Sequence, residues 1–193
     1  VSRDGKKVAA VFNLPDGYAG IADGTDPTKF LLTPIESDGA RLWNFASFSP
    51  DGSKLITVWN GTMSLRDGTT GKLIKNVPAA MLGGRAAMPE WSPDGESIVF
   101  VRVTGRGRLG SDFGNMDIKA GDWFLGDAGD IATLPYNGGN FGPATTIVAS
   151  TAGSEFHFYP TFSPDSAWIL FNSASTPGCA SDSAAAKTGF NLR

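Results

Sequence analysis

A glycine- and arginine-rich segment, Gly105-Arg106-Gly107-Arg108-Leu109-Gly110, has the residue types and spacing of an anion-binding loop. The G-x-G-x-x-G spacing occurs in dinucleotide sites, which also require a helix that begins at the glycines within a β-α-β unit. Residues 111–117 do not have the sequence of such a helix. We therefore interpret the segment as a loop, in which Arg106 and Arg108 can pair with an anion or with a partner carboxylate.

Aromatic residues follow in the same stretch, 104–126, which we expect to be an insertion. Aromatic side chains on a long loop can form a recognition surface. The alternative is that they fold back over the edge of an adjacent sheet. The candidate partner-binding residues are Arg106, Arg108, Phe113, Trp123 and Phe124.

The single histidine, His157, limits the catalytic chemistry of these residues. A metal centre with several histidines is excluded, and any Ser-His-Asp triad would have to use His157. This histidine lies in the aromatic segment Phe156-His157-Phe158-Tyr159-Pro160, where a packed or hydrogen-bonded side chain is expected, and the sequence contains no G-x-S-x-G segment. We therefore predict no catalytic residues and no enzyme activity within these residues.

Four aspartates, Asp23, Asp26, Asp127 and Asp130, lie in glycine-containing loops, where carboxylate oxygens could bind a calcium ion. None of them matches the D-x-[DN]-x-[DN]-G pattern of a calcium loop. We predict no metal and no cofactor, with calcium as the alternative.

The elements that must position all these residues are built around a turn sequence that occurs four times, as in Phe48-Ser49-Pro50-Asp51-Gly52. Proline presets φ, aspartate caps the turn with its side chain, and glycine adopts a positive φ. The apolar run that follows each turn suits a buried strand, so each copy predicts a β-hairpin. The structural turn residues are Asp4, Asp51, Asp94 and Asp165.

The spacing of these turns predicts the architecture. The first three copies recur at intervals of about 45 residues, which is the length of a four-stranded propeller blade. The longer interval before the fourth copy contains the insertion 104–126. In the fourth copy Ser166 replaces the turn glycine, which requires either a strained residue or a different turn type.

The repeat, an aromatic residue followed by S-P-D-G and a short apolar strand, resembles the repeat of TolB-type β-propellers, the WD-like repeats of extracytoplasmic bacterial proteins. Similar blades occur in the propeller domains of prolyl-oligopeptidase-type and tricorn-type peptidases. The resemblance covers most of residues 1–174. It implies an all-β fold, a β-propeller of four-stranded antiparallel blades, and a periplasmic or extracellular location.

We expect about three and a half blades, in units 1–41, 42–83, 84–150 and 151–174, and an irregular Ser/Ala-rich tail over 175–193. Propellers close with about four to eight blades. We therefore expect that the native protein is longer or that another chain completes the ring, because open sheet edges invite aggregation. No amphipathic helix is expected.

Strands are expected at 8–12, 17–22, 29–33, 45–48, 55–59, 62–66, 72–77, 98–103, 130–134, 145–149, 156–162 and 168–172. The tryptophans expected in the core or between blades are Trp43, Trp59, Trp91 and Trp168.

Charge and composition narrow the function further. The net charge of −3 disfavours general nucleic-acid binding. The sequence contains no run of about 18 apolar residues, the length that a membrane-spanning helix needs. We predict a non-enzymatic binding or scaffold module that presents loops to a protein or glycan partner. Two alternatives remain open: the propeller domain of a larger prolyl-oligopeptidase-like hydrolase, and a structural subunit of an extracellular assembly.

Overall fold

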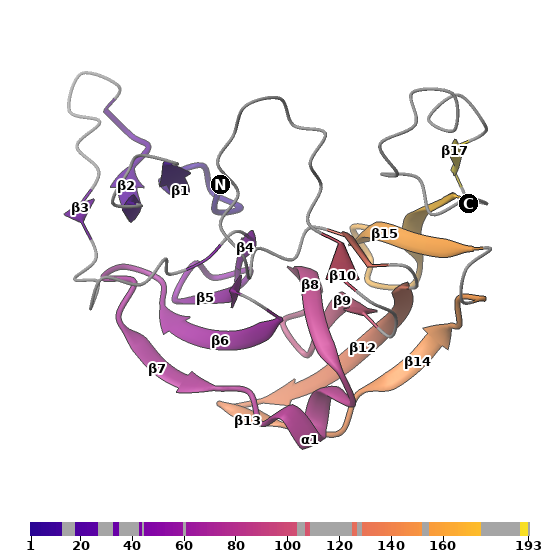
Figure 1. Cartoon of the computed structure of the whole chain (residues 1–193). Coiled ribbons are helices and arrows are strands. Elements are labelled where there is room, and N and C mark those ends of the chain that lie inside the picture. Colours follow the sequence, from indigo (N-terminus) through magenta and orange to yellow (C-terminus); the bar gives the residue numbers. More distant parts are fainter. Residues whose placement is uncertain are drawn as a thin grey trace.

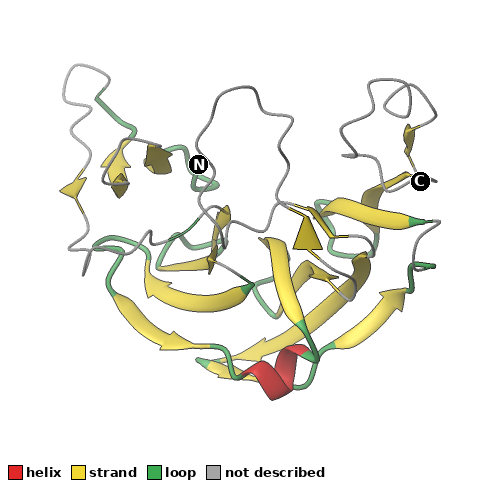
Figure 2. Ribbon diagram, viewed as in Figure 1, coloured by secondary structure: helices red, strands yellow, loops and turns green. Residues whose placement is uncertain are grey.

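The computed structural model describes residues 1–12, 18–26, 33–34, 43, 45–59, 61–103, 107–108, 125–126, 129–151, 155–174 and 190–192. In these ranges the regular elements are β-strands and one short helix, and the strands form antiparallel sheets arranged along an arc (Figure 1, Figure 2). The first and last sheets lie at the two ends of the arc, on its open side (Figure 1). The predicted all-β class is confirmed.

The first two sheets are meanders in which consecutive strands pair. The strands predicted for the second sheet are confirmed within one residue at each end, because its turns carry strong glycine signals. Sheet 1 consists of β1 (Lys7–Phe12), β2 (Tyr18–Asp23) and β3 (Thr33–Pro34). Sheet 2 consists of β4 (Phe45–Phe48), β5 (Lys54–Trp59), β6 (Thr62–Asp67) and β7 (Leu73–Asn76).

Sheet 3 has the strand order β8-β9-β12-β14, with β13 pairing beside β14 on the same edge of β12. Its first strand, β8, lies within the expected unit 84–150 but is not among the strands predicted from the sequence. The strands are β8 (Arg85–Trp91), β9 (Ser97–Val103), β12 (Gly129–Asn137), β13 (Asn140–Phe141) and β14 (Thr145–Val148). Within the expected insertion, β10 (Gly107–Arg108) pairs with β11 (Leu125–Gly126).

Sheet 4 consists of β15 (Phe156–Phe162), β16 (Ile169–Ala174) and β17 (Phe190–Leu192). Strand β17 lies in the segment that the sequence predicts as an irregular tail, where a three-residue strand has too short a pattern to detect. The helix α1 (Ala79–Leu82), also not predicted, is a single turn between β7 and β8. It follows Pro78 and ends at Gly83, whose φ is 67°.

The hydrophobic core lies between neighbouring sheets rather than beneath one of them. In β5, Leu55 packs with residues of sheet 1, whereas Ile56 packs with residues of sheet 3. In β9, Ile98 faces sheet 2 and Val99 faces sheet 4. Because successive side chains of a strand point to opposite faces, each central strand contributes to two interfaces between sheets.

The expectation that the tryptophans lie in the core holds for Trp43 and Trp91, which are buried, and Trp59 is half-buried. It is wrong for Trp168, which is 75% exposed. Trp168 follows the fourth turn at the position that Lys54 occupies in the second copy. In sheets 2 and 3 the next sheet lies beyond this face of the strand, but sheet 4 is the last in the described chain.

Candidate binding site

The predicted partner-binding residues Arg106, Phe113, Trp123 and Phe124 lie outside the described residues. Only the backbone of Arg108 is described, in β10, where it pairs with Leu125. The backbone of Gly107 and Arg108 is therefore strand, not the start of the helix that a dinucleotide site requires. The site that the described residues do form lies elsewhere.

The repeated turns have the same hydrogen bonds in all four copies. In the second copy, the Ser49 hydroxyl donates to Asp51 Oδ1 (2.6 Å), the Ser53 N–H donates to the same oxygen (3.0 Å), and the Lys54 N–H donates to Ser49 Oγ (2.9 Å). The Gly52 N–H donates to the Ser49 carbonyl (2.8 Å). Corresponding bonds surround the carboxylates of Asp4, Asp94 and Asp165.

These bonds lower the pKa of all four turn carboxyls. In each turn the largest cause is the serine hydroxyl, and the next is the backbone N–H two residues after the aspartate. The pKa of Asp51 falls from 3.8 to about 2. These aspartates are therefore ionised at neutral pH and act as hydrogen-bond acceptors within their own turns, which makes them poor general acids.

Neighbouring turns contact one another across the gaps between sheets. The Lys7 ammonium donates to the Gly52 carbonyl (2.9 Å), which joins the first sheet to the second turn. The Asp94 N–H donates to Ser166 Oγ (3.2 Å), which joins the third turn to the fourth. Ser166 has a φ of 61°, so the strained alternative predicted for this position is the one that occurs. Hydrogen bonds between sheets therefore link the first copy to the second turn and the third turn to the fourth.

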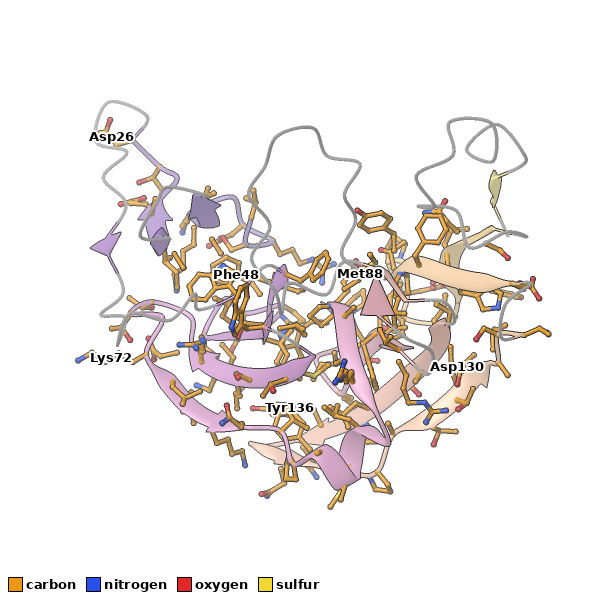
Figure 3. All side chains as sticks on the ribbon, viewed as in Figure 1. Asp26, Phe48, Lys72, Met88, Asp130 and Tyr136 are labelled. Carbon is orange, nitrogen blue, oxygen red and sulfur yellow. The ribbon has the colours of Figure 1, made fainter. Side chains whose placement is uncertain are left out.

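The first strands of sheets 2, 3 and 4 lie side by side on the inner side of the arc. The Ser47 hydroxyl of β4 accepts the Trp91 N–H of β8 (3.2 Å), and the Thr161 hydroxyl of β15 donates to Glu90 Oε1 of β8 (2.7 Å). In Figure 3, Phe48 and Met88 lie on this inner side and Lys72 lies on the outer side. Strands β4, β8 and β15 therefore form the wall around a common centre.

Two adjoining cavities occupy that centre. The larger, of about 470 Å³, extends to the turns and is lined by Arg3, Phe48, Trp91 and Phe162 among others. The smaller, of about 280 Å³, is lined by residues that include Met88 and Tyr159. They share Ala46, Pro89 and Glu90. Among the described lining side chains, Glu90 is the acidic one and Arg3 the basic one, and aromatic residues and prolines predominate.

Two matching backbone kinks border the smaller cavity. Met88 in β8 has a φ of 49° and Tyr159 in β15 has a φ of 50°. Each coincides with a shift in strand register, between Ala87 and Glu90 and between Phe158 and Thr161. Such bulges re-aim side chains and are frequent next to functional sites. Here they leave Met88 buried and Tyr159 47% exposed at the cavity.

Sequence reasoning missed these residues, although a signal was present. Met88 and Tyr159 each precede a proline that stands three residues before the turn serine, as in Met88-Pro89-Glu90-Trp91-Ser92. Proline has no N–H to donate, so within a strand it marks an edge or a bulge. The second copy has Ala46 at this position, and its strand β4 has no positive φ.

The histidine is a packing residue. His157 is 2% exposed, its ring packs edge-on against Phe171 at 5.0 Å, and its Nε2 lies 3.4 Å from the Ala149 carbonyl oxygen. Among the described residues no serine hydroxyl bonds to its ring, and the buried Nδ1 has no hydrogen-bond partner. This arrangement is not that of a catalytic triad.

Of the four aspartates considered for calcium, Asp23 and Asp130 lie on different sheets. Asp23 accepts the Thr25 N–H and hydroxyl within its own turn, and Asp130 pairs with Arg102. Asp127 lies outside the described residues. Within the described part of the chain, no three His, Cys, Asp or Glu side chains are placed to hold a metal ion.

The arrangement of the sheets matches known structures. TolB from Acinetobacter baumannii aligns over 98% of this chain and 38% of its own, with a TM-score of 0.54 and 19% identity. The fold is a TolB-like β-propeller. The putative TolB from Agrobacterium tumefaciens aligns over 91% of this chain and 53% of its own (TM-score 0.52, 18% identity). The propeller domain of the Trilobed protease from Pyrococcus furiosus aligns over 100% of this chain and 52% of its own (TM-score 0.51, 14% identity).

Sheets 1 to 4 are thus blades 1 to 4 of a propeller, and the chain spans about half or less of each of these similar chains. No protein-family model and no curated protein matches the sequence. No helix among the described residues is long and apolar enough to cross a membrane.

Proposed function

We propose that this chain is a non-enzymatic binding module, and that the two central cavities receive part of a protein partner. The observation that carries the proposal is the pair of kinks at Met88 and Tyr159. Each positive φ in a non-glycine residue costs about 1–3 kcal/mol and persists only where the surrounding structure enforces it. Two strained residues stand at equivalent positions and border the same cavity. A binding role for this cavity wall explains why the strain is retained.

The lining indicates the chemistry of the partner. Glu90 is half-buried and holds the hydroxyl of Thr161, so its carboxylate can accept a further charged hydrogen bond from a lysine or arginine. Prolines and aromatic rings around it offer apolar contact area. A short extended peptide with a basic residue beside an apolar one fits these groups. A glycan would need more hydrogen-bonding side chains than this lining supplies.

Further contacts belong to the same proposal. The insertion residues Arg106, Arg108, Phe113, Trp123 and Phe124 would supply further contacts with the partner. A periplasmic or extracellular location, implied by the resemblance to TolB-type repeats, is also part of the proposal.

Selection of peptides from a displayed random library on the immobilised protein tests this function. We expect peptides with a lysine or arginine next to an apolar residue. Glu90→Gln should weaken their binding about tenfold, because the carboxylate loses its charge while keeping its shape. Tyr159→Ala should weaken it by a similar factor. Leu73→Ala is the matched control, because Leu73 is 52% exposed but lies on β7, outside the cavities.

Selected peptides that bind Glu90→Gln and Tyr159→Ala as tightly as the unaltered chain would contradict the proposal. If the protein instead binds glycans on an array, and both substitutions abolish that binding, the proposed site would stand but its partner would be a glycan.

A further inference from the structure

The wall of the central cavities lacks free backbone donors at four positions. Strands β4, β8 and β15 are the first strands of their sheets, so each has one edge that no strand of its own sheet pairs. Pro89 and Pro160 have no N–H group. The Trp91 N–H is bonded to a serine hydroxyl of β4, and the Tyr159 N–H is bonded to the Met88 sulfur. The backbone at these positions therefore has no N–H to offer to a ligand.

This lack of donors bears on the conformation of a bound peptide. A peptide that adds a strand to a sheet edge needs a regular series of N–H and carbonyl groups along that edge. A polyproline II helix makes no hydrogen bonds of its own and keeps its backbone hydrated, so it needs no such series. The wall therefore disfavours strand addition and suits a polyproline II segment.

The side chains of the wall include the aromatic rings on which proline-rich segments dock. Tyr159 is 47% exposed at the smaller cavity, and Phe158 packs edge-on against its ring, with 5.7 Å between the ring centroids. Phe162 is half-buried at the larger cavity. Grooves lined by aromatic rings bind proline-rich segments, because the polyproline II helix is already formed and loses little entropy on binding. These rings therefore favour proline as the apolar residue of the partner.

Glu90 lines both cavities and supplies a negative charge beside these rings. Its Oε1 accepts the Thr161 hydroxyl at 2.7 Å, which holds the carboxylate in place. A carboxylate accepts several hydrogen bonds, so Glu90 can also pair with a lysine or arginine of the ligand. In a polyproline II helix every third residue lies on the same side, about 9 Å apart. Prolines at that spacing can face the wall together while an adjacent basic side chain reaches Glu90.

We propose that the segment of the partner that enters the central cavities is a proline-rich peptide in the polyproline II conformation. Prolines at every third position pack on the wall that contains Tyr159 and Phe162, and a lysine or arginine next to one of them pairs with Glu90. This inference rests on the binding function proposed above, to which it adds the conformation and the residue type of the ligand.

Two displayed peptide libraries, selected in parallel on the immobilised chain, test the conformation of the ligand. The first library has proline fixed at every third position, the second has valine fixed at the same positions, and all other positions are random. Valine is the matched residue because it is apolar but favours a strand. We expect the proline library to be enriched, with a lysine or arginine next to a fixed proline in the selected peptides.

Fluorescence anisotropy with the tightest selected peptide then measures the contribution of proline. Replacing its fixed prolines by alanine should weaken binding about tenfold. Tyr159→Ala should remove most of this difference, because the prolines lose the exposed ring, whereas Tyr159→Phe keeps a ring and should preserve it. Leu73→Ala is the matched control outside the cavities and should also preserve it. Circular dichroism establishes that each variant is folded.

The outcomes separate this inference from the function on which it rests. Enrichment of the valine library, with binding that Tyr159→Ala and Glu90→Gln both weaken, overturns the polyproline II ligand but leaves the binding site in place. Selected peptides that bind both of these variants as tightly as the unaltered chain overturn the ligand and the site together. Enrichment of neither library also overturns the polyproline II ligand.

Discussion

The backbone N–H of Tyr159 donates a hydrogen bond to the sulfur of Met88, 3.2 Å away, and the two residues occupy the same repeat position in adjacent blades. Both have a positive φ and both precede a proline. The bond therefore joins two strained positions to each other. It fixes the spacing of β8 and β15 at the wall of the smaller cavity.

Substitution of Met88 tests whether the strained backbone is present in solution. Met88→Leu and Met88→Ile both remove the sulfur acceptor and nearly conserve the volume of this buried side chain. Isoleucine is β-branched and tolerates a positive φ poorly, so Met88→Ile should destabilise the fold by about 1–2 kcal/mol more than Met88→Leu. Urea unfolding measures both values. Equal losses in the two variants would show that Met88 does not have this conformation.

The hairpins could be predicted from the sequence because all their determinants lie within each turn. Ser49, Asp51 and Gly52 make the bonds of the turn among themselves and with the residues just after it. Blade 2 was therefore predicted to within one residue at each strand end. The strand β8 is not among the strands expected from the sequence, because its bulge at Met88 interrupts the alternation that indicates a strand.

The central site could not be predicted in the same way. Its walls come from three strands that are far apart in the sequence, and the bond between Glu90 and Thr161 exists only once blades 3 and 4 pack together. For Trp168, by contrast, the sequence predicted burial and the structure shows an exposed side chain. Its residue type predicts burial, whereas its repeat position, shared with Lys7 and Lys54, places it at the edge toward a following blade.

The lowered pKa of Asp51 predicts how stability depends on pH. Because the folded-state pKa, about 2, lies below the ordinary value of 3.8, the carboxylate's contribution is complete above pH 3.8 and is lost as the pH falls toward 2. Asp51→Asn should therefore lower the unfolding free energy at pH 7 by about 1 kcal/mol, a small value because the side chain is exposed to solvent.

Urea unfolding of both proteins between pH 7 and pH 2 measures this effect. The difference between Asp51→Asn and the unaltered chain should shrink as the pH falls below 3.8. A difference that is constant across this range would mean that the carboxylate's charge contributes nothing to the turn.

The difference between the third and fourth turns predicts unequal effects on stability for two reciprocal substitutions. Gly95 has a φ of 79° in the third turn, and Ser166 has a φ of 61° at the same position of the fourth. Gly95→Ser should destabilise the fold by about 1 kcal/mol, because a side chain disfavours this conformation. Ser166→Gly relieves the same strain but removes the bond from the Asp94 N–H, so its stabilising effect should be smaller.

Thermal unfolding of the two variants shows whether each substitution raises or lowers stability. The expected order of melting temperatures places Ser166→Gly at or above the unaltered chain and Gly95→Ser below it. A Gly95→Ser variant as stable as the unaltered chain would show that the third turn can change type without cost.

The ion pair between Arg102 and Asp130 joins β9 to β12 within blade 3. Their side chains are 17% and 10% exposed, and the nitrogen and oxygen are 3.0 Å apart. Burial raises the pKa of Asp130, but hydrogen bonds from Ser150 and Arg102 outweigh it, so the pKa is lowered. Arg102 also donates to the Thr146 hydroxyl of β14. The pair therefore holds three strands of the blade together.

Removing one partner should cost more than removing both. Asp130→Ala leaves the guanidinium buried without its counter-charge, and we expect a loss of about 3 kcal/mol. The double variant Arg102→Ala, Asp130→Ala removes the unpaired charge and should recover part of that loss. Lys6→Ala is the control, because the pair Lys6–Asp4 is exposed and 3.8 Å apart, so that its loss should leave the unfolding free energy nearly unchanged. Urea unfolding of the unaltered chain, both single variants, the double variant and Lys6→Ala measures these differences. A double variant less stable than Asp130→Ala by the full cost of Arg102→Ala would mean that the two side chains act independently.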